Sequence, residues 1–203
     1  MATLTFDDVT FSVPEPGSVA ERIIDATLRC VARWGVAKTT VDDVAREAGV
    51  GRATLYRMFP GGRDALFDGA VGAETARFFA RLDALLVTTT SLEDTLVIGI
   101  VEAGSTLRDH PPLQFLLAHE PEAILPHMAF HQMDAVLRTI AALAGPYLAP
   151  WLSDREAAAR AAEWVARIVL SYVVAPSADV DVCDAASVRN LVRLFILPGL
   201  QAG

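Results

Sequence analysis

Apolar residues recur at helical spacing along most of the chain, and short breaks rich in glycine, proline and polar residues separate these stretches. In the first third, the pattern predicts helices over residues 18–35, 41–48 and 52–59. Six further helices are predicted over residues 64–87, 92–108, 113–119, from beyond Pro126 to about 143, 154–174 and 185–197. No strand-like alternation of useful length is found, so the chain is predicted to be all-α, with about nine helices.

Residues 39–59, TTVDDVAREAGVGRATLYRMF, have the pattern of a helix-turn-helix. Thr40 offers a hydroxyl acceptor where the first helix begins, and Gly49 stands where that helix ends and the backbone must turn. Ala45 leaves room for a close crossing of the two helices, and Val50 is expected to fill the turn. This pattern is typical of the motif whose second helix enters the major groove of DNA.

The outer face of the second helix carries four hydrogen-bond donors with no acidic residue among them: Arg52, Thr54, Tyr56 and Arg57. Such donors suit phosphates and base edges. The alternative is an ordinary helical hairpin with a solvated polar face. That alternative does not explain why a small residue, a turn glycine and an apolar turn residue occur together, so the DNA-binding interpretation is preferred.

Residues 19–67 resemble the N-terminal domain of the tetracycline-repressor (TetR) family of bacterial transcription regulators. The resemblance runs from VAERIIDATLRCVARWGVAKTTV through DVAREAGVGRATLYRMF to GGRDALF. Three features depart from the family pattern. Members commonly have serine or threonine at the position of Gly51 and histidine or tyrosine near Met58, and the link from Pro60 to Arg63 is about one residue longer than the common form. The resemblance implies a helical regulator that binds an operator in double-stranded DNA and holds an effector in its body.

We predict a flexible arm over residues 1–17, a DNA-binding domain over 18–67, and a ligand-binding and dimerisation domain over 68–203. Base edges are expected to be read by Arg52, Thr54 and Arg57, and phosphates to be held by Lys38, Thr40, Tyr56 and Arg63. The full predicted DNA-binding set is Lys38, Thr39, Thr40, Gly51, Arg52, Ala53, Thr54, Tyr56, Arg57 and Arg63.

Charge is unevenly distributed along the chain, whose formal net charge is −8. Residues 18–67 hold eight basic and six acidic side chains, whereas residues 68–203 hold nine basic and sixteen acidic ones. An acidic body repels DNA, so this distribution turns the helix-turn-helix end of the molecule toward the duplex.

Several features favour a cytoplasmic protein without membrane contact. No uncharged apolar run approaches the roughly 18 residues that a membrane span needs. The first residues lack the basic region of a signal peptide, and Cys30 and Cys183 are far apart in the sequence.

The body is expected to bind a small apolar effector. The predicted helix over residues 92–108 is apolar on nearly all sides, which is typical of a central helix in a bundle. Large apolar side chains around small residues such as Gly99 and Gly104 suggest a cavity, although plain core remains the alternative for each residue. The predicted effector-binding set is Phe79, Ile100, Gly104, Phe115, Met128 and Trp164.

A two-fold homodimer is expected through residues 154–174 and 185–197. The hydrophobic fraction of 53% is high and favours surface hidden by self-association. Small side chains would allow close helix approach, and large apolar ones would supply area. These residues are Ala157, Ala158, Ala161, Ala162, Ala166, Trp164, Val165, Ile168, Val169, Leu191, Leu194 and Phe195. The half-sites of the operator would then lie about 34–36 Å apart, or a multiple of that distance.

Metal and enzyme interpretations find little support. His127 and His131 are four residues apart, but the sequence HMAFH lacks the HExxH pattern, so neither a metal nor another cofactor is expected. No nucleophile elbow or phosphate-binding loop is present. The competing hypothesis, a helical small-molecule-binding protein or enzyme with an incidental helix-turn-helix, gives no reason for a recognition face free of acids.

Overall fold

The computed structural model of the protein describes residues 2–6, 9–122 and 131–201. In these residues nine helices follow one another, as predicted, when the continuous helical stretch from Ala185 to Gln201 is taken as one. The chain divides into two compact units, residues 1–77 with 110–129 and residues 78–109 with 130–203. The predicted all-α class is confirmed, and the fold adds one element to it, a short hairpin near the N-terminus.

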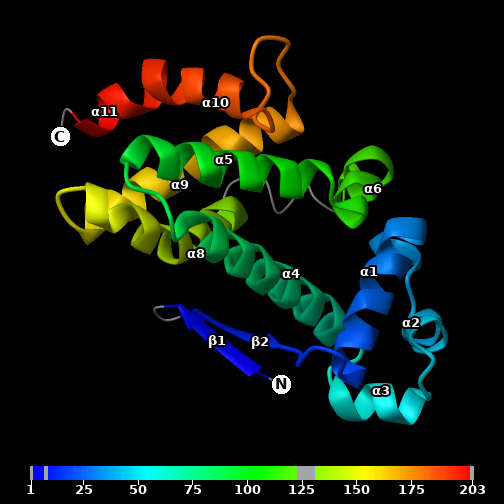
Figure 1. Ribbon diagram of the computed structural model, residues 1–203. Coiled ribbons are helices and arrows are strands. Elements are labelled where there is room, and N and C mark those ends of the chain that lie inside the picture. Colours follow the sequence, from blue (N-terminus) through cyan, green and yellow to red (C-terminus); the bar gives the residue numbers. More distant parts are fainter. Residues whose placement is uncertain (1, 7–8, 123–130, 202–203) are drawn as a thin grey trace. The chain divides into compact units, whose positions relative to one another are not determined.

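The first unit contains the helix-turn-helix (Figure 1). Its helices are α1 (Val19–Lys38), α2 (Val41–Ala48), α3 (Arg52–Met58), the first part of α4 (Arg63–Leu86) and α6 (Pro111–His119). Ser18 caps α1 by accepting a hydrogen bond from the Glu21 backbone N–H. Gly35 lies at φ 80° and ψ 175° and interrupts α1 where the sequence predicts the end of that helix.

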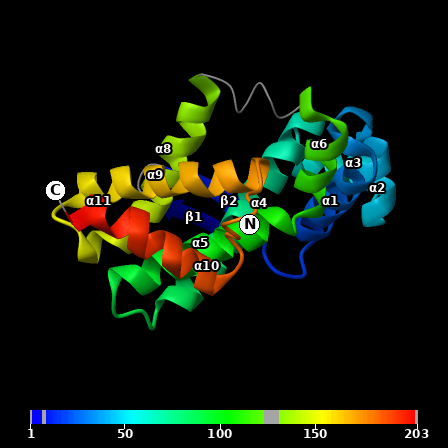
Figure 2. The same ribbon diagram turned by 90° about the horizontal axis from the view of Figure 1, so that it is seen from above.

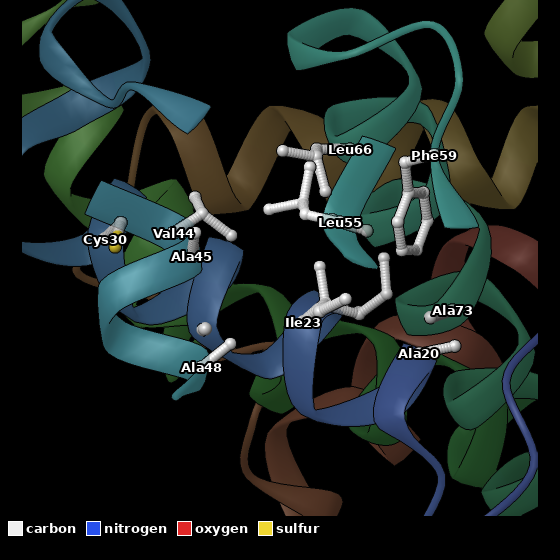
Figure 3. Close-up of a cluster of buried hydrophobic side chains, with 13 residues drawn as sticks. Ala20, Ile23, Cys30, Val44, Ala45, Ala48, Leu55, Phe59, Leu66 and Ala73 are labelled. Atoms are coloured by element: carbon white, nitrogen blue, oxygen red, sulfur yellow. The ribbon is translucent and has the colours of Figure 1, made fainter. Parts of the chain in front are cut away.

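A cluster of buried apolar side chains holds these helices together (Figure 3). Ile23 of α1, Val44 of α2 and Leu55 of α3 are each fully buried and meet in this cluster. Ala45 is also buried, in agreement with the prediction that the crossing admits only a small side chain. Burial of each large apolar side chain contributes about 1.5–3 kcal/mol, so this core fixes the geometry of the two short helices, which are too short to be stable alone.

The arm predicted over residues 1–17 contains a pair of strands that the sequence pattern does not predict. Strands β1 (Ala2–Phe6) and β2 (Val9–Val13) form an antiparallel pair in which Leu4 lies opposite Phe11 and Phe6 opposite Val9. The signal in the sequence was the short alternation of apolar and polar residues in ATLTF and VTFSV, on either side of Asp7 and Asp8. Each segment has only five residues, which is short for an alternation of this kind to indicate a strand.

The second unit is a helical bundle made from the later part of α4 together with α5 (Leu92–Arg108), α8 (His131–Leu148), η1 (Ala149–Trp151), α9 (Arg155–Val174), α10 (Ala185–Leu191), η2 (Val192–Ile196) and α11 (Leu197–Gln201). Helices α8 and α9 share its most extensive contact, and α10 lies beside α5 (Figure 2). Ile100 of α5 and Val192 of η2 are fully buried in its core. Arg189 and Arg193 bind Glu93, which ties the last helical stretch to the start of α5.

The predicted break at Gly145 and Pro146 is wrong, because α8 continues to Leu148 with Pro146 inside it. Pro146 has no backbone N–H and cannot donate to the carbonyl four residues earlier, so the last turn of α8 forms without that hydrogen bond. Packing against α9 also holds this turn, since a Cβ on Gly145 would lie 3.3 Å from the Cα of Ala159. Tertiary contact therefore overrides the local signal for a break.

Candidate nucleic-acid interface

The start of α2 is stabilised by a reciprocal pair of hydrogen bonds. The Thr40 hydroxyl accepts from the Asp43 backbone N–H at 3.2 Å, and the Asp43 carboxylate accepts from the Thr40 backbone N–H at 3.3 Å. The hydrogen bond from the Thr40 hydroxyl is the main reason that the pKa of Asp43 lies below its ordinary value. Thr40 is therefore the helix cap that the sequence predicts, and it is exposed at the surface.

The turn between α2 and α3 depends on one left-handed residue. Gly49 lies at φ 65° and ψ 37°, and the next backbone N–H, that of Val50, donates to the Ala45 carbonyl at 3.0 Å. A side chain at this φ would strain the backbone, which explains the glycine. Val50 packs against the buried cluster, so the turn is held from both sides.

Helix α3 presents the predicted recognition face to solvent. Gly51, Arg52, Ala53, Tyr56 and Arg57 are exposed, and Thr54 is half-buried. Gly51 precedes the helix without a side-chain cap. The expectation that this face meets no acid needs correction, because Asp42 of α2 forms an ion pair with Arg52. The sequence does not reveal this pair, since it crosses the turn between two helices.

Most other basic side chains around the motif are already paired. Arg29 and Arg33 of α1 both bind Glu47 of α2, at 2.7 and 3.2 Å. Arg46 binds Asp43 at 3.1 Å. By contrast, no salt bridge reaches Lys38 or Arg57 in residues 9–122, and both side chains are exposed. These two cations are therefore available to an anionic partner, as is the exposed Arg22 of α1, which no salt bridge reaches within residues 9–122.

Two of the predicted DNA-binding residues form hydrogen bonds with the backbone of the same unit. The Thr39 side chain is only 2% exposed, and its hydroxyl donates to the Gly35 carbonyl at 2.6 Å, so it does not reach the surface. The Arg63 guanidinium donates to the Thr39 carbonyl at 3.2 Å and to the Val36 carbonyl, and it lies over the ring of Phe67. Arg63 thus clamps the segment that leads into α2, and its role as a phosphate contact stays a prediction.

The predicted effector-binding residues are divided between the two units of the chain. Phe79 and Ile100 are buried in the second unit, whereas Trp164 is 43% exposed there. Phe115 belongs to the first unit, where it stacks on His119. Met128 lies outside the described residues. The expectation that Gly104 leaves room for a ligand is wrong, because a Cβ there would lie 2.7 Å from the Val182 carbonyl oxygen, so the glycine serves a close backbone approach.

The predicted dimer surface divides into buried and exposed residues. Ala158, Ala161, Ala162, Val169 and Leu191 are buried in the core of the second unit, so they stabilise the fold itself. The remaining exposed apolar residues are Trp164, at 43%, Leu194, at 59%, and Phe195, at 67%.

His127, one of the two histidines considered as metal ligands, lies outside the described residues, and the side chain of the other, His131, is not described. Among the residues that were searched, no group of three or more potential metal ligands occurs. None of the described helices combines the length and apolar character needed to cross a membrane.

Comparisons with known proteins agree with this geometry. Residues 23–70 match the family model for bacterial regulatory proteins of the tetR family. An uncharacterised HTH-type transcriptional regulator from Mycobacterium tuberculosis, strain H37Rv, is 29% identical over 180 residues, which cover 88% of this chain and 84% of that protein. The same values hold for the corresponding protein from strain CDC 1551.

Solved structures show the same fold. The TetR family repressor AlkX from Dietzia sp., implicated in biodegradation of n-alkanes, has a TM-score of 0.64 at 23% identity and covers 89% of this chain and 97% of its own. The fatty acid degradation regulator FadR from Bacillus halodurans has a TM-score of 0.60 at 19% identity, with 86% and 98% covered. SmeT, the repressor of a multidrug efflux pump of Stenotrophomonas maltophilia, has a TM-score of 0.56 at 17% identity, with 90% of each chain covered.

Proposed function

We propose that the chain is a DNA-binding transcriptional regulator of the TetR family, not an enzyme, and that it acts as a cytoplasmic repressor released from its operator by a small apolar effector. The observation that carries the proposal is the exposed face of α3, which includes Tyr56 and Arg57 and follows the helix-turn-helix geometry of α2, Gly49 and α3.

We propose a division of labour among these donors. Arg57, Thr54 and Arg52 contact base edges in the major groove, and Arg52 first leaves Asp42. Lys38, Thr40 and Tyr56 hold phosphates, with the backbone at Gly51 and Ala53 approaching the DNA closely. Support comes from exposure and from the lack of salt bridges to Lys38 and Arg57 within residues 9–122.

We propose that the operator is palindromic and that two copies of the chain bind it through a shared interface on α9 and the α10–α11 stretch. The support is the exposure of Trp164, Leu194 and Phe195, because large apolar side chains in such positions are stabilised when a partner covers them. A two-fold dimer also matches the symmetry of a palindrome.

For the effector, we propose a site in the second unit near Phe79 and Ile100. Phe79 is buried and stacks on Tyr147, whose hydroxyl donates to Asp83 at 2.7 Å. Burial raises the pKa of the Tyr147 hydroxyl, which agrees with the desolvated surroundings of this pair of rings. A Cβ built at Gly99 of α5 meets no atom within 4 Å, so this side of the helix has space that a larger side chain would fill.

The DNA-binding mode is tested by selecting duplexes from a randomised pool with the wild-type protein. The expected result is a palindromic consensus and a footprint on both half-sites. The double variant Arg52→Ala with Arg57→Ala should lose at least tenfold in affinity for the selected duplex, because each base contact contributes about 1–3 kcal/mol. A variant that binds as tightly as the wild type would contradict the assignment of these residues.

The dimer is tested by light scattering at micromolar concentration. The variant Phe195→Glu should shift the protein toward the monomer and weaken operator binding. Val87→Glu is the matched control, because Val87 is also an exposed apolar residue of the second unit but lies outside α9 and α10. A wild-type monomer, or equal behaviour of the two variants, would refute the proposed interface.

The effector proposal is tested by releasing the protein from labelled duplex with a panel of apolar compounds that includes n-alkanes and fatty acids. A coupling of about 1–3 kcal/mol would weaken DNA binding roughly 5- to 150-fold. Gly99→Phe should abolish the response while DNA affinity without effector is retained. If the effector releases Gly99→Phe from DNA as well as it releases the wild type, the proposed site near Gly99 is refuted.

A further inference from the structure

Glu120, the residue that follows α6, holds the backbone of the helix-turn-helix from a position far away in the sequence. Its side chain is buried, at 8% exposure. Its Oε2 accepts hydrogen bonds from the backbone N–H of Val36 at 2.9 Å and of Ala37 at 3.3 Å, although the two segments are more than 80 residues apart. A buried carboxylate without donors would be costly, so these bonds are strong determinants of the local structure.

Gly35 makes this contact possible. At φ 80° and ψ 175° it interrupts α1, and the two following N–H groups donate to the same oxygen. A Cβ at Gly35 would lie 2.1 Å from the other carboxylate oxygen of Glu120. Glycine is thus required both by the backbone angle and by the approach of the acid.

The segment that Glu120 holds leads directly to the proposed phosphate contacts. Residues 35–40 connect α1 with α2 and include Lys38 and Thr40. The carbonyls of this segment are bound by Arg63 and by the Thr39 hydroxyl, whereas two of its N–H groups are bound by Glu120. Carbonyl and N–H groups of this segment are therefore both held by side chains, and the N–H groups are held by the residue that follows α6.

Helix α6 itself is anchored within the same unit. It packs along α1, and at its start the His110 ring accepts the Leu113 backbone N–H at 3.2 Å through Nδ1. The other ring nitrogen of His110 lies 3.3 Å from the Glu74 carboxylate on α4. Glu120 is therefore presented by a helix whose start is also bonded to the unit.

We propose that Glu120 is a positioning residue for DNA binding, whose carboxylate orders residues 35–40 so that Lys38 and Thr40 meet the phosphate backbone. This inference rests on the proposed DNA contacts of those two residues. The duplex is not touched by Glu120; its contribution is to remove the conformational freedom that the segment would otherwise lose on binding.

The test compares Glu120→Ala with Glu122→Ala on the duplex selected with the wild-type protein. Both variants remove one acid from the same part of the chain, but Glu122 is exposed. Glu120→Ala should bind the duplex about tenfold more weakly, the scale of one charge-assisted hydrogen bond. Its salt dependence should fall by about one unit of slope, since one phosphate contact is lost. Glu122→Ala should keep the wild-type slope.

A double-mutant cycle with Lys38→Ala separates positioning from general destabilisation. If Glu120 acts by placing Lys38, then Lys38→Ala should cost much less in the Glu120→Ala background than in the wild type. Additive losses would overturn the proposal. Thr40 offers a second arm of the same kind, with the reservation that it also caps α2.

Glu120→Gln keeps one acceptor oxygen and should recover part of the affinity, which also covers the case in which the alanine variant fails to fold. Amide hydrogen exchange at Val36 and Ala37 should be faster in both variants than in the wild type. The rate should be highest in Glu120→Ala and intermediate in Glu120→Gln. Wild-type affinity in Glu120→Gln together with unchanged exchange at both amides would refute the role of the carboxylate. Failure of the wild-type protein to select any duplex would instead refute the proposed function itself.

Discussion

Replacement of Asp42 by asparagine should increase the affinity for DNA while it decreases stability. In the free protein, Asp42 of α2 pairs with Arg52 of α3, and their side chains are 45% and 66% exposed. An exposed ion pair contributes about 0.2–1 kcal/mol. If Arg52 must leave this pair to bind a base, the free energy of the pair is subtracted from the free energy of DNA binding.

The magnitude follows from the same range. Asp42→Asn should bind the selected duplex about 1.4- to 5-fold more tightly, which is that free energy expressed as a ratio of dissociation constants. Stability should fall by about 0.3–1 kcal/mol, because Asp42 also places negative charge in the first turn of α2. The two measurements thus move in opposite directions, which a general structural defect would not produce.

Fluorescence anisotropy with labelled duplex measures the affinity, and urea denaturation measures the stability. Asp68→Asn is the matched control, since Asp68 is an exposed acid on α4 of the same unit. The gain should vanish in the Arg52→Ala background. An equal gain in Asp68→Asn, or a gain that persists without Arg52, would show that only the net charge has changed and would refute the competition between Asp42 and DNA.

Three further outcomes are expected. Arg57→Ala should weaken binding to the selected duplex by about 1–3 kcal/mol, whereas Arg46→Ala, which removes an arginine already paired with Asp43, should change it little; equal losses in gel shifts would contradict the distinction between paired and unpaired cations. Gly51→Ser should raise the free energy of unfolding by a few tenths of a kcal/mol, because a Cβ there meets no atom within 4 Å and the serine hydroxyl can cap α3. A lower Tm in thermal denaturation would show that a serine side chain does not fit at this position. The pKa of Glu74 lies below its ordinary value of 4.5, mainly because His110 donates a hydrogen bond to it, so the stability that it contributes is present above pH 4.5 and is lost as the pH falls through the lowered value. Wild type and Glu74→Gln should therefore differ in urea denaturation at pH 7 and converge in acid, and a constant difference would count against this linkage.

Local signals in the sequence predicted the helices well, because caps and turns act within a few residues. Ser18, Thr40, Ser91 and Asp154 each accept a backbone N–H three residues further along, and each stands at a predicted helix start. Gly49 adopts the left-handed angle that its position in the motif predicts. The recognition face of α3 was also predicted, since its exposed side follows from helical spacing alone.

Local patterns are insufficient where a short-range signal is weak or where packing overrides it. The sequence predicts a helix end before Pro146, but contact with α9 keeps α8 helical around this residue. The hairpin of β1 and β2 is not predicted, because each strand has only five residues. In both cases the local signal is present in the sequence, but the sequence alone does not show how strongly that signal counts.

The role of a polar side chain depended on residues far away in the sequence. Thr39 and Arg63 belong to the DNA-binding set that the sequence predicts, yet tertiary structure turns both toward the backbone of residues 35–39. The pairing of Arg52 with Asp42 crosses a turn, and Glu120 reaches Val36 from the residue that follows α6. Helical periodicity tells which face of a helix is polar, but hydrogen bonds between segments are fixed only when the apolar core has brought those segments together.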